Sequence, residues 1–194
     1  HDYHVKILRI DPLIMVVDNF LQPGEANHMM NISASHMTRS GLQFGDGVGY
    51  EERTRTSTTA WIEYHRDVVT RCIHERIKQF TNIPEEDIEA LQVIRYQPGQ
   101  HYSPHYDFMR DDAMLMSDDW SRLKGQRWAT MIVYLNEPQA GGATAFPRLN
   151  LAFRPVKNSA IFWLNLDRNG LEDWRTEHAG EPVIGGEKWA MNIW

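Results

Sequence analysis

The stretch LQVIRYQPGQHYSPHYDF, residues 91–108, marks the point at which the periodicity of the sequence changes. Before it, apolar residues recur at helical spacing, whereas after residue 90 the period is close to two, as in strands. A Pro98-Gly99 turn separates two strand candidates, 91–96 and 101–108. Further candidates, bounded by turn signals, are 127–135, 143–146, 159–166, 175–178 and 188–194. Short strands at close spacing, with no helix between them, predict an antiparallel barrel or double sheet.

Residues 1–90 have a different character. The spacing of apolar residues predicts helices over 23–37 and 67–81, and NIPEEDIEA predicts a short third helix over 82–90. Helices first and strands later favour an α+β fold with the helices packed on one face of a jelly-roll core. We therefore expect a single domain over 1–194, with a mainly helical support region over 1–90 and the jelly-roll core over 91–194.

The composition argues against several classes of protein. Hydrophobic residues make up 42% and charged residues 24% of the chain, as in folded domains. No apolar run reaches the ~18–20 residues that span a bilayer, so we expect no membrane contact by this domain. The net charge of −6 and the lack of any Lys/Arg block argue against nucleic acid as a partner. Cys72, the single cysteine, excludes an intrachain disulfide and is expected to be buried on its helix.

Two long segments have no regular apolar period. Residues 39–55 are rich in glycine, and residues 109–126 are acidic. Loops of this length inside a compact domain are often lids over a site, and plain surface excursions are the alternative.

His105 and Asp107 form a His-x-Asp pair on a candidate strand, where alternation turns both side chains to one face. The pair is weak evidence alone, because such pairs also arise by chance. His178, just before the final turn and strand, offers a third ligand. Two imidazoles and one carboxylate on one face of a metal ion are the ligands of non-haem Fe(II) oxygenases. Lys188 opens the last strand, where its ammonium group can meet the remote carboxylate of a metal-chelating ligand.

The last two strands pose a geometric problem. If Gly185-Gly186 is the centre of a regular hairpin, Lys188 pairs with Val183, and alternation turns Lys188 and His178 to opposite faces. Both can face one metal only if an extra residue shifts the alternation. We expect that residue in a bulge at Ala179-Gly180.

Six stretches, in one order and with one spacing, resemble the catalytic domain of the prolyl 4-hydroxylases. They are RTS (55–57), LQVIRYQPGQHYSPHYDF (91–108), QRWATMIVYLN (126–136), GGATAFP (141–147), NSAIFW (158–163) and HAGEPVIGGEKWAMNIW (178–194). The resemblance implies a double-stranded β-helix, or jelly roll, and hydroxylation of C4 of proline in a peptide or protein. It implies Fe(II), 2-oxoglutarate and O₂, with release of succinate and CO₂, and ascorbate to rescue iron oxidised in uncoupled turnovers. It also favours the endoplasmic reticulum or secretory pathway, and leaves a partner subunit or further domains open.

The resemblance also implies roles for individual residues. It implies that Lys188 binds the C5 carboxylate of 2-oxoglutarate, with hydroxyl groups from Tyr96 and Thr144, and that Trp194 walls this pocket. The metal ligands that it implies are His105, Asp107 and His178.

Tyr102 and Arg127 match positions that the family uses near the peptide substrate. Tyr102 lies three positions before the first ligand, so strand alternation turns it away unless Pro104 disturbs the pairing. Pro104 cannot donate a ladder hydrogen bond, which makes such a disturbance expected. His101 matches no ligand position, and we interpret it as structural or as part of the rim.

The sequence departs from the family pattern at one position, and this departure weakens what the resemblance implies about the substrate and the compartment. Glu181 stands where collagen-modifying members of the family commonly carry Cys. Hydroxylation of another residue, such as lysine, is the rival reaction in the same class. A zinc hydrolase with the same ligands has no need of Lys188, and a binding jelly roll without turnover would be expected to have lost a ligand.

Overall fold

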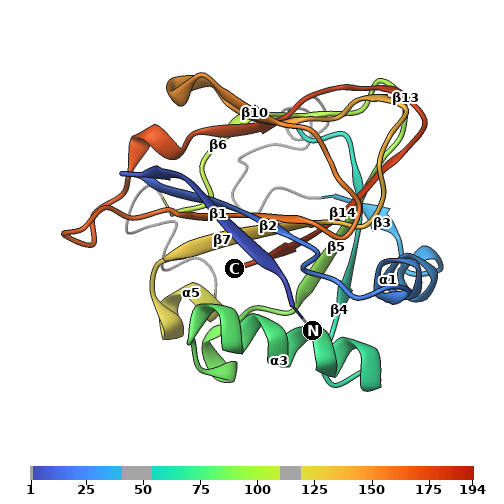
Figure 1. Cartoon of the computed structure of the whole chain (residues 1–194), viewed down its shortest axis with the longest axis horizontal. Helices are drawn as coiled ribbons and strands as arrows, with labels where there is room; N and C mark the ends of the chain where they lie inside the picture. Colours follow the sequence, from blue (N-terminus) through green and yellow to red (C-terminus); the bar gives the residue numbers. More distant parts are fainter. Residues whose placement is uncertain (1, 41–53, 110–118) are drawn as a thin grey trace.

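The computed structural model describes residues 2–40, 54–109 and 119–194. Within these residues the core consists of antiparallel sheets (Figure 1). The larger sheet has the strand order β1 (His4–Ile10), β2 (Leu13–Asp18), β11 (Ala160–Leu164), β7 (Ala129–Tyr134), β14 (Lys188–Ile193), β5 (Leu91–Tyr96), β4 (Thr58–Ile62), β3 (Thr38–Arg39). A second sheet has the order β10 (Leu151–Phe153), β9 (Thr144–Phe146), β12 (His178–Gly180), β6 (Tyr102–His105). Strands β8 (Ala140–Gly141) and β13 (Val183–Gly185) pair separately.

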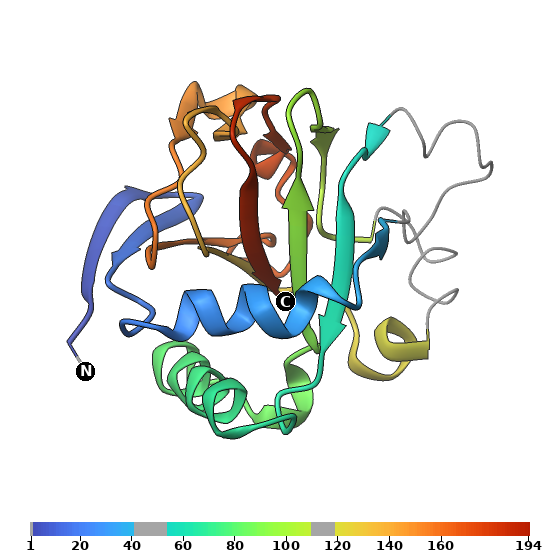
Figure 2. The same cartoon turned by 90° about the vertical axis from the view of Figure 1, so that its right-hand side faces the viewer.

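Two helices cover one face of the larger sheet (Figure 2). They are α1 (Glu25–Ala34) and α3 (Val68–Thr81), and both were predicted. Helix α3 begins at a capping box, in which Asp67 accepts a hydrogen bond from the Thr70 amide and Thr70 Oγ1 accepts one from the Asp67 amide. The shorter helices are α5 (Asp119–Lys124), η1 (Glu85–Asp87), η2 (Pro147–Leu149) and η3 (Trp174–Thr176). Among the described residues, no helix is both long and apolar enough to cross a bilayer.

The central strands of the larger sheet are buried on both faces, and strand alternation divides their side chains between two apolar clusters. In β5, Leu91 and Val93 pack toward the helices, whereas Ile94 and Tyr96 pack toward the second sheet. The same division holds along β7 and β14. The α+β jelly roll with helices on one face is therefore confirmed.

The region predicted as mainly helical, 1–90, also supplies four strands, and this part of the prediction was incomplete. Strands β1 to β4 extend the larger sheet at both of its edges. The prediction of a third helix over 82–90 was wrong except for the single turn η1. Asn82 instead ends α3 in the left-handed conformation, at φ 57°. Cys72 is exposed rather than buried, because it lies on the solvent side of α3. Most of the two predicted loop segments, at 41–53 and 110–118, lies outside the described residues.

The predicted strand 175–178 and the final hairpin were also wrong. Residues 174–176 form η3, and β12 begins only at His178. Strand β13 pairs with β8 while β14 pairs with β5 and β7, so Lys188 lies opposite Tyr96 and not Val183. Each strand of the supposed hairpin thus belongs to a different sheet, and regular hairpin alternation does not apply.

The expected irregularity exists, but on the other strand. In the β12–β6 ladder, His178 lies opposite His105 and Gly180 lies opposite Tyr102. Two steps along β12 thus match three along β6, so the extra residue lies in β6, around Pro104. Proline lacks the amide hydrogen that a regular ladder requires at this point. The shift turns Tyr102 toward the same cavity as the histidines.

Candidate active site

A cavity of about 540 Å³ is lined from both sheets and contains the three candidate metal ligands. His105 ends β6, Asp107 follows two residues later, and His178 begins β12, directly opposite His105. The donor atoms of these three side chains lie within 4.8 Å of one another. The Nε2 atoms of His105 and His178 are 3.7 and 3.4 Å from the nearest carboxylate oxygens of Asp107. One nitrogen from each imidazole and one carboxylate thus converge, and together they form a candidate facial ligand set.

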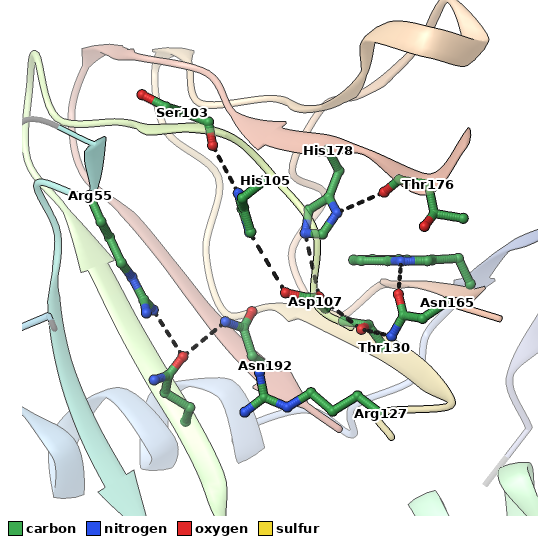
Figure 3. A network of polar contacts seen from close by, with 12 residues as sticks. Arg55, Ser103, His105, Asp107, Arg127, Thr130, Asn165, Thr176, His178 and Asn192 are labelled. Carbon is green, nitrogen blue, oxygen red and sulfur yellow. Dashed lines mark hydrogen bonds and ion pairs between the residues drawn. The ribbon is translucent and has the colours of Figure 1, made fainter. Parts of the chain in front are cut away.

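Backbone carbonyl groups fix the orientation of both histidines (Figure 3). Nδ1 of His105 lies 2.8 Å from the Ser103 carbonyl oxygen, and Nδ1 of His178 lies 3.0 Å from that of Thr176. A carbonyl oxygen only accepts, so each Nδ1 carries the hydrogen. Each Nε2 therefore keeps its lone pair and faces Asp107, the tautomer that a metal site requires.

Asp107 is oriented by a chain of buried hydrogen bonds. Thr130 Oγ1 donates to Asp107 Oδ2 at 2.8 Å, and Asn165 Nδ2 donates to Thr130 Oγ1 at 2.9 Å. Trp163 Nε1 in turn donates to Asn165 Oδ1 at 2.8 Å. The chain holds the carboxylate in place without using its other oxygen, Oδ1, which remains available to a metal.

The electrostatics keep His105 and Asp107 in the form that binds a metal. Burial, followed by the neighbouring His178, lowers the pKa of His105 to about 3, so its imidazole is neutral. Burial opposes ionisation of Asp107, but the adjacent His178 and His105 outweigh it and hold the pKa of this carboxyl at about 2. A neutral imidazole nitrogen and an ionised carboxylate are the ligand forms that Fe(II) accepts.

Lys188 lies in the same cavity and is 3% exposed. Burial lowers the pKa of its ammonium group to about 8, and the charge of Glu181 opposes this only in part. Its Nζ lies 5.6 Å from the ring centroids of both Tyr96 and Tyr134, and Tyr134 donates a hydrogen bond of 2.8 Å to Thr144 Oγ1. Among the described residues, no carboxylate lies within salt-bridge distance of Lys188. A buried cation in this situation suits a ligand that brings its own negative charge.

A second group of potential ligands, on α3 and η1, is less suited to a metal. His74, Glu75 and Glu85 have donor atoms within 4.8 Å of one another. However, Lys78 Nζ lies 3.0 Å from Glu75 and 3.4 Å from Glu85, so an ammonium group already neutralises both carboxylates. The cavity between the sheets is the stronger candidate.

Residues 91–194 match the family model of the 2OG-Fe(II) oxygenase superfamily. This chain belongs to that superfamily. Prolyl 4-hydroxylase subunit alpha-2 of Caenorhabditis elegans is 38% identical over 192 residues, which cover 98% of this chain and 35% of that relative. Probable prolyl 4-hydroxylase 3 of Arabidopsis thaliana is 30% identical over 213 residues, covering 100% of this chain and 72% of the relative. The chain thus spans about a third of the C. elegans protein and is a prolyl 4-hydroxylase-like oxygenase domain.

Solved structures agree with this assignment. The viral collagen prolyl hydroxylase of Paramecium Bursaria Chlorella virus-1, solved as a complex with 2OG, superposes with a TM-score of 0.72. The two are 30% identical, and the match covers 93% of this chain and 94% of the viral one. A prolyl-4-hydroxylase of Pseudomonas putida has the same fold, with a TM-score of 0.60 at 18% identity.

In this oxygenase domain, the far end of the cavity contains Arg127 and Trp194. Arg127 forms a bidentate pair with Glu89, at 2.6 and 2.8 Å, and its guanidinium lies 3.9 Å from the centroid of the Trp194 ring. Trp194 also lies beside Trp61, with ring centroids 6.1 Å apart. Trp194 lies six positions after Lys188 along the chain, which is about 20 Å at ~3.3 Å per residue. Trp194 thus contacts Arg127 and lines the same cavity as Lys188, and its role as a wall of the 2-oxoglutarate pocket stays a prediction.

The other predicted residues lie as follows. Tyr96 and Thr144 are buried in the cavity near Lys188. The ring of Tyr102 stacks on that of His105, with centroids 3.5 Å apart, and is partly exposed at the rim. His101 is tied by its backbone to Thr56 and does not line the cavity, in agreement with a structural role.

Sequence reasoning missed the polar residues that support the site from the central strands. Those that reach the cavity or Asp107 are Gln92 on β5, Thr130 on β7 and Asn192 on β14. Each lies in a mainly apolar strand whose side chains are nearly all buried. A polar side chain in such a strand needs a partner inside the protein, and this signal could have identified all three.

Proposed function

We propose that this domain hydroxylates proline in a peptide or protein substrate at C4, with 2-oxoglutarate converted to succinate and CO₂. The observation that supports this most directly is a buried lysine in the same cavity as two histidines and a carboxylate. A metal hydrolase has no use for such a cation, whereas an oxygenase that anchors a dicarboxylate requires one. The similarity to prolyl 4-hydroxylases points to proline as the target.

His105 and His178 would hold Fe(II) through Nε2, and Asp107 through its carboxylate. Fe(II), when bound there, supplies the oxidising chemistry that uses O₂ and 2-oxoglutarate. The carbonyl groups of Ser103 and Thr176 and the hydroxyl group of Thr130 keep these side chains in position. Preset ligands reduce the reorganisation that metal binding costs.

Lys188 would bind the C5 carboxylate of 2-oxoglutarate, with the hydroxyl groups of Tyr96 and Thr144 as further donors. All three are buried and line the same cavity. The other end of the cosubstrate would then point toward the metal ligands. Ascorbate would restore iron that is oxidised in turnovers without substrate.

The peptide would enter over Tyr102 and extend toward Arg127 and Trp194. Aromatic rings suit the uncharged pyrrolidine ring of proline. A lysine substrate would instead require an unengaged carboxylate in the cavity. Of the described residues that line it, Asp107 is assigned to the metal, and Glu177 is paired with Arg148 at 3.0 Å.

The decisive experiment compares matched peptides that differ only in carrying proline or lysine at one position. The domain is incubated with Fe(II), 2-oxoglutarate, ascorbate and O₂, and fragmentation mass spectrometry locates the added oxygen. Oxygen on C4 of proline is expected. Oxygen on lysine, or on C3 of proline, would refute the proposed substrate while leaving the metal site intact.

A further inference from the structure

We infer that Asn192 is a fixed hydrogen-bond acceptor for the peptide substrate, and that Gln92 sets its orientation. The inference rests on the proposed function and adds a specific contact to it. Asn192 is 8% exposed and lines the cavity from β14, directly opposite Gln92 on β5. Its Oδ1 is buried and has no hydrogen-bond partner among the described residues. Buried polar atoms are rarely left unpaired, which points to a donor that arrives with a ligand.

The orientation of the Asn192 amide follows from the chemistry of its neighbours. Arg55 donates to Gln92 Oε1 at 2.9 Å, and a guanidinium group can only donate. This contact identifies the Gln92 atom as the oxygen. Asn192 must therefore turn its amide nitrogen to Gln92, where Nδ2 donates to the same oxygen at 3.0 Å. If the Asn192 amide were flipped, its Oδ1 would face Gln92 Oε1, and two acceptors cannot form a hydrogen bond. Oδ1 is therefore held away from Gln92.

The position of Asn192 selects the ligand. It lies four residues along β14 from Lys188 on the same face, about 13 Å away at ~3.3 Å per residue. Trp61, Arg127 and Trp194 line the same part of the cavity, away from the cosubstrate anchor. In Figure 3 the Asn192 side chain points toward the side on which His105 and Asp107 lie.

An acceptor at this position needs a donor. 2-Oxoglutarate has only acceptor oxygens, and the proline ring within a chain has no N–H. The donor that a peptide brings is the backbone N–H of a residue beside the reacting proline. Water can hold this place before the peptide binds. The contact would fix how deeply the proline enters and which of its carbons faces the metal ligands.

The test removes the hydrogen bond from either side. Peptides in which the residue before or after the proline is joined through an ester lose one N–H and little else. We expect the ester at one of these two positions to lower kcat/KM of the unmodified domain about tenfold, the size of one neutral hydrogen bond. Asn192→Ala should lower kcat/KM for the amide peptide about as much. In this variant, replacing the amide by the same ester should lower kcat/KM further by less than about twofold.

The role of Gln92 is tested by two substitutions. Gln92→Glu keeps an acceptor for both Arg55 and Asn192, so it should retain peptide affinity. Gln92→Leu removes this acceptor and should lower peptide affinity about as much as Asn192→Ala does. Peptide affinity is also measured without turnover, by fluorescence polarisation in the absence of O₂. Asn27→Ala, an exposed helix residue, is the matched control.

Three results would overturn the inference. One is an ester penalty that stays the same in Asn192→Ala, and another is no penalty at either position. The third is an Asn192→Ala variant that binds the peptide as tightly as the unmodified domain but has a changed KM for 2-oxoglutarate, or forms a changed amount of succinate without peptide. This last result would place the donor on the metal side of the cavity. If the unmodified domain hydroxylates no proline peptide, the proposed function fails first.

Discussion

Replacing Lys188 by methionine should weaken the binding of 2-oxoglutarate and, at the same time, stabilise the empty domain. Methionine keeps most of the length of the side chain but removes its charge. Lys188 is only 3% exposed, and its Nζ lies 5.6 Å from the ring centroids of both Tyr96 and Tyr134. The lysine is therefore placed for a ligand rather than for the stability of the fold.

The magnitudes follow from the burial of this group. Its pKa falls from 10.5 to about 8, so the folded domain disfavours the charged form by about 3 kcal/mol. A lowered lysine pKa destabilises the fold fully below about pH 8, and the penalty fades as the pH rises toward 10.5. At pH 7, Lys188→Met should therefore raise the free energy of unfolding by about 1–3 kcal/mol. Losing the charged partner should cost 2-oxoglutarate binding about 3–5 kcal/mol, which raises its KM at least about a hundredfold.

Two measurements check these opposite effects. Denaturant unfolding at pH 7, without cosubstrate, gives the stability, and succinate formation against 2-oxoglutarate concentration gives the KM. Iron affinity should remain close to that of the unmodified domain, because Lys188 contacts no candidate ligand. Lys188→Arg should recover part of the affinity, since it keeps the charge but not the shape. An unchanged KM in Lys188→Met would refute the assignment of the cosubstrate site.

Three further predictions concern the same cavity. The KM for 2-oxoglutarate should rise as the pH passes about 8, because the empty site then loses the lysine proton, and Lys188→Arg should remove this rise in a pH series of KM. Asp107→Ala and His178→Ala should each abolish succinate formation and iron binding, measured by metal titration, while His101→Ala retains both; an active, folded ligand variant would contradict the metal site. Thr130→Val should lower iron affinity about 10- to 100-fold by releasing Asp107, and equal affinity would show that this hydrogen bond does not orient the ligand.

The sequence indicated the candidate ligands and the jelly roll because their signals are local. A helical period ends and a period of two begins near residue 91, and His105 and Asp107 stand two positions apart on the same segment. His178 could be joined to them only through resemblance, because its distance depends on which strands pair. The structure places His178 directly opposite His105, a relation that no local pattern contains.

The errors of the sequence-based prediction have the same origin. The stretch VIGGEKW, residues 183–189, most simply predicts a hairpin between β13 and β14. This prediction is wrong because each of the two strands pairs with strands of a different sheet. Strands β1 and β2 were missed in a region whose clearest period was helical. The bulge was assigned to Gly180 because glycine permits one, whereas Pro104 on the partner strand demands one. Pairing partners decide such questions, and they are fixed only by the tertiary fold.

One physical constraint links the fold to the chemistry of the cavity. The central strands of the larger sheet are covered by helices on one face and by the second sheet on the other, so most side chains on them are apolar. In β14 the residues that pack toward the helices are Trp189, Met191 and Ile193. The two polar residues of the same strand, Lys188 and Asn192, both fall on the opposite face and both line the cavity. A buried cation and a buried unpaired amide oxygen each weaken the fold unless a ligand satisfies them. Their placement at the two ends of one strand face therefore indicates two separate ligands, an anion at Lys188 and a hydrogen-bond donor at Asn192, with the candidate metal ligands facing them across the cavity.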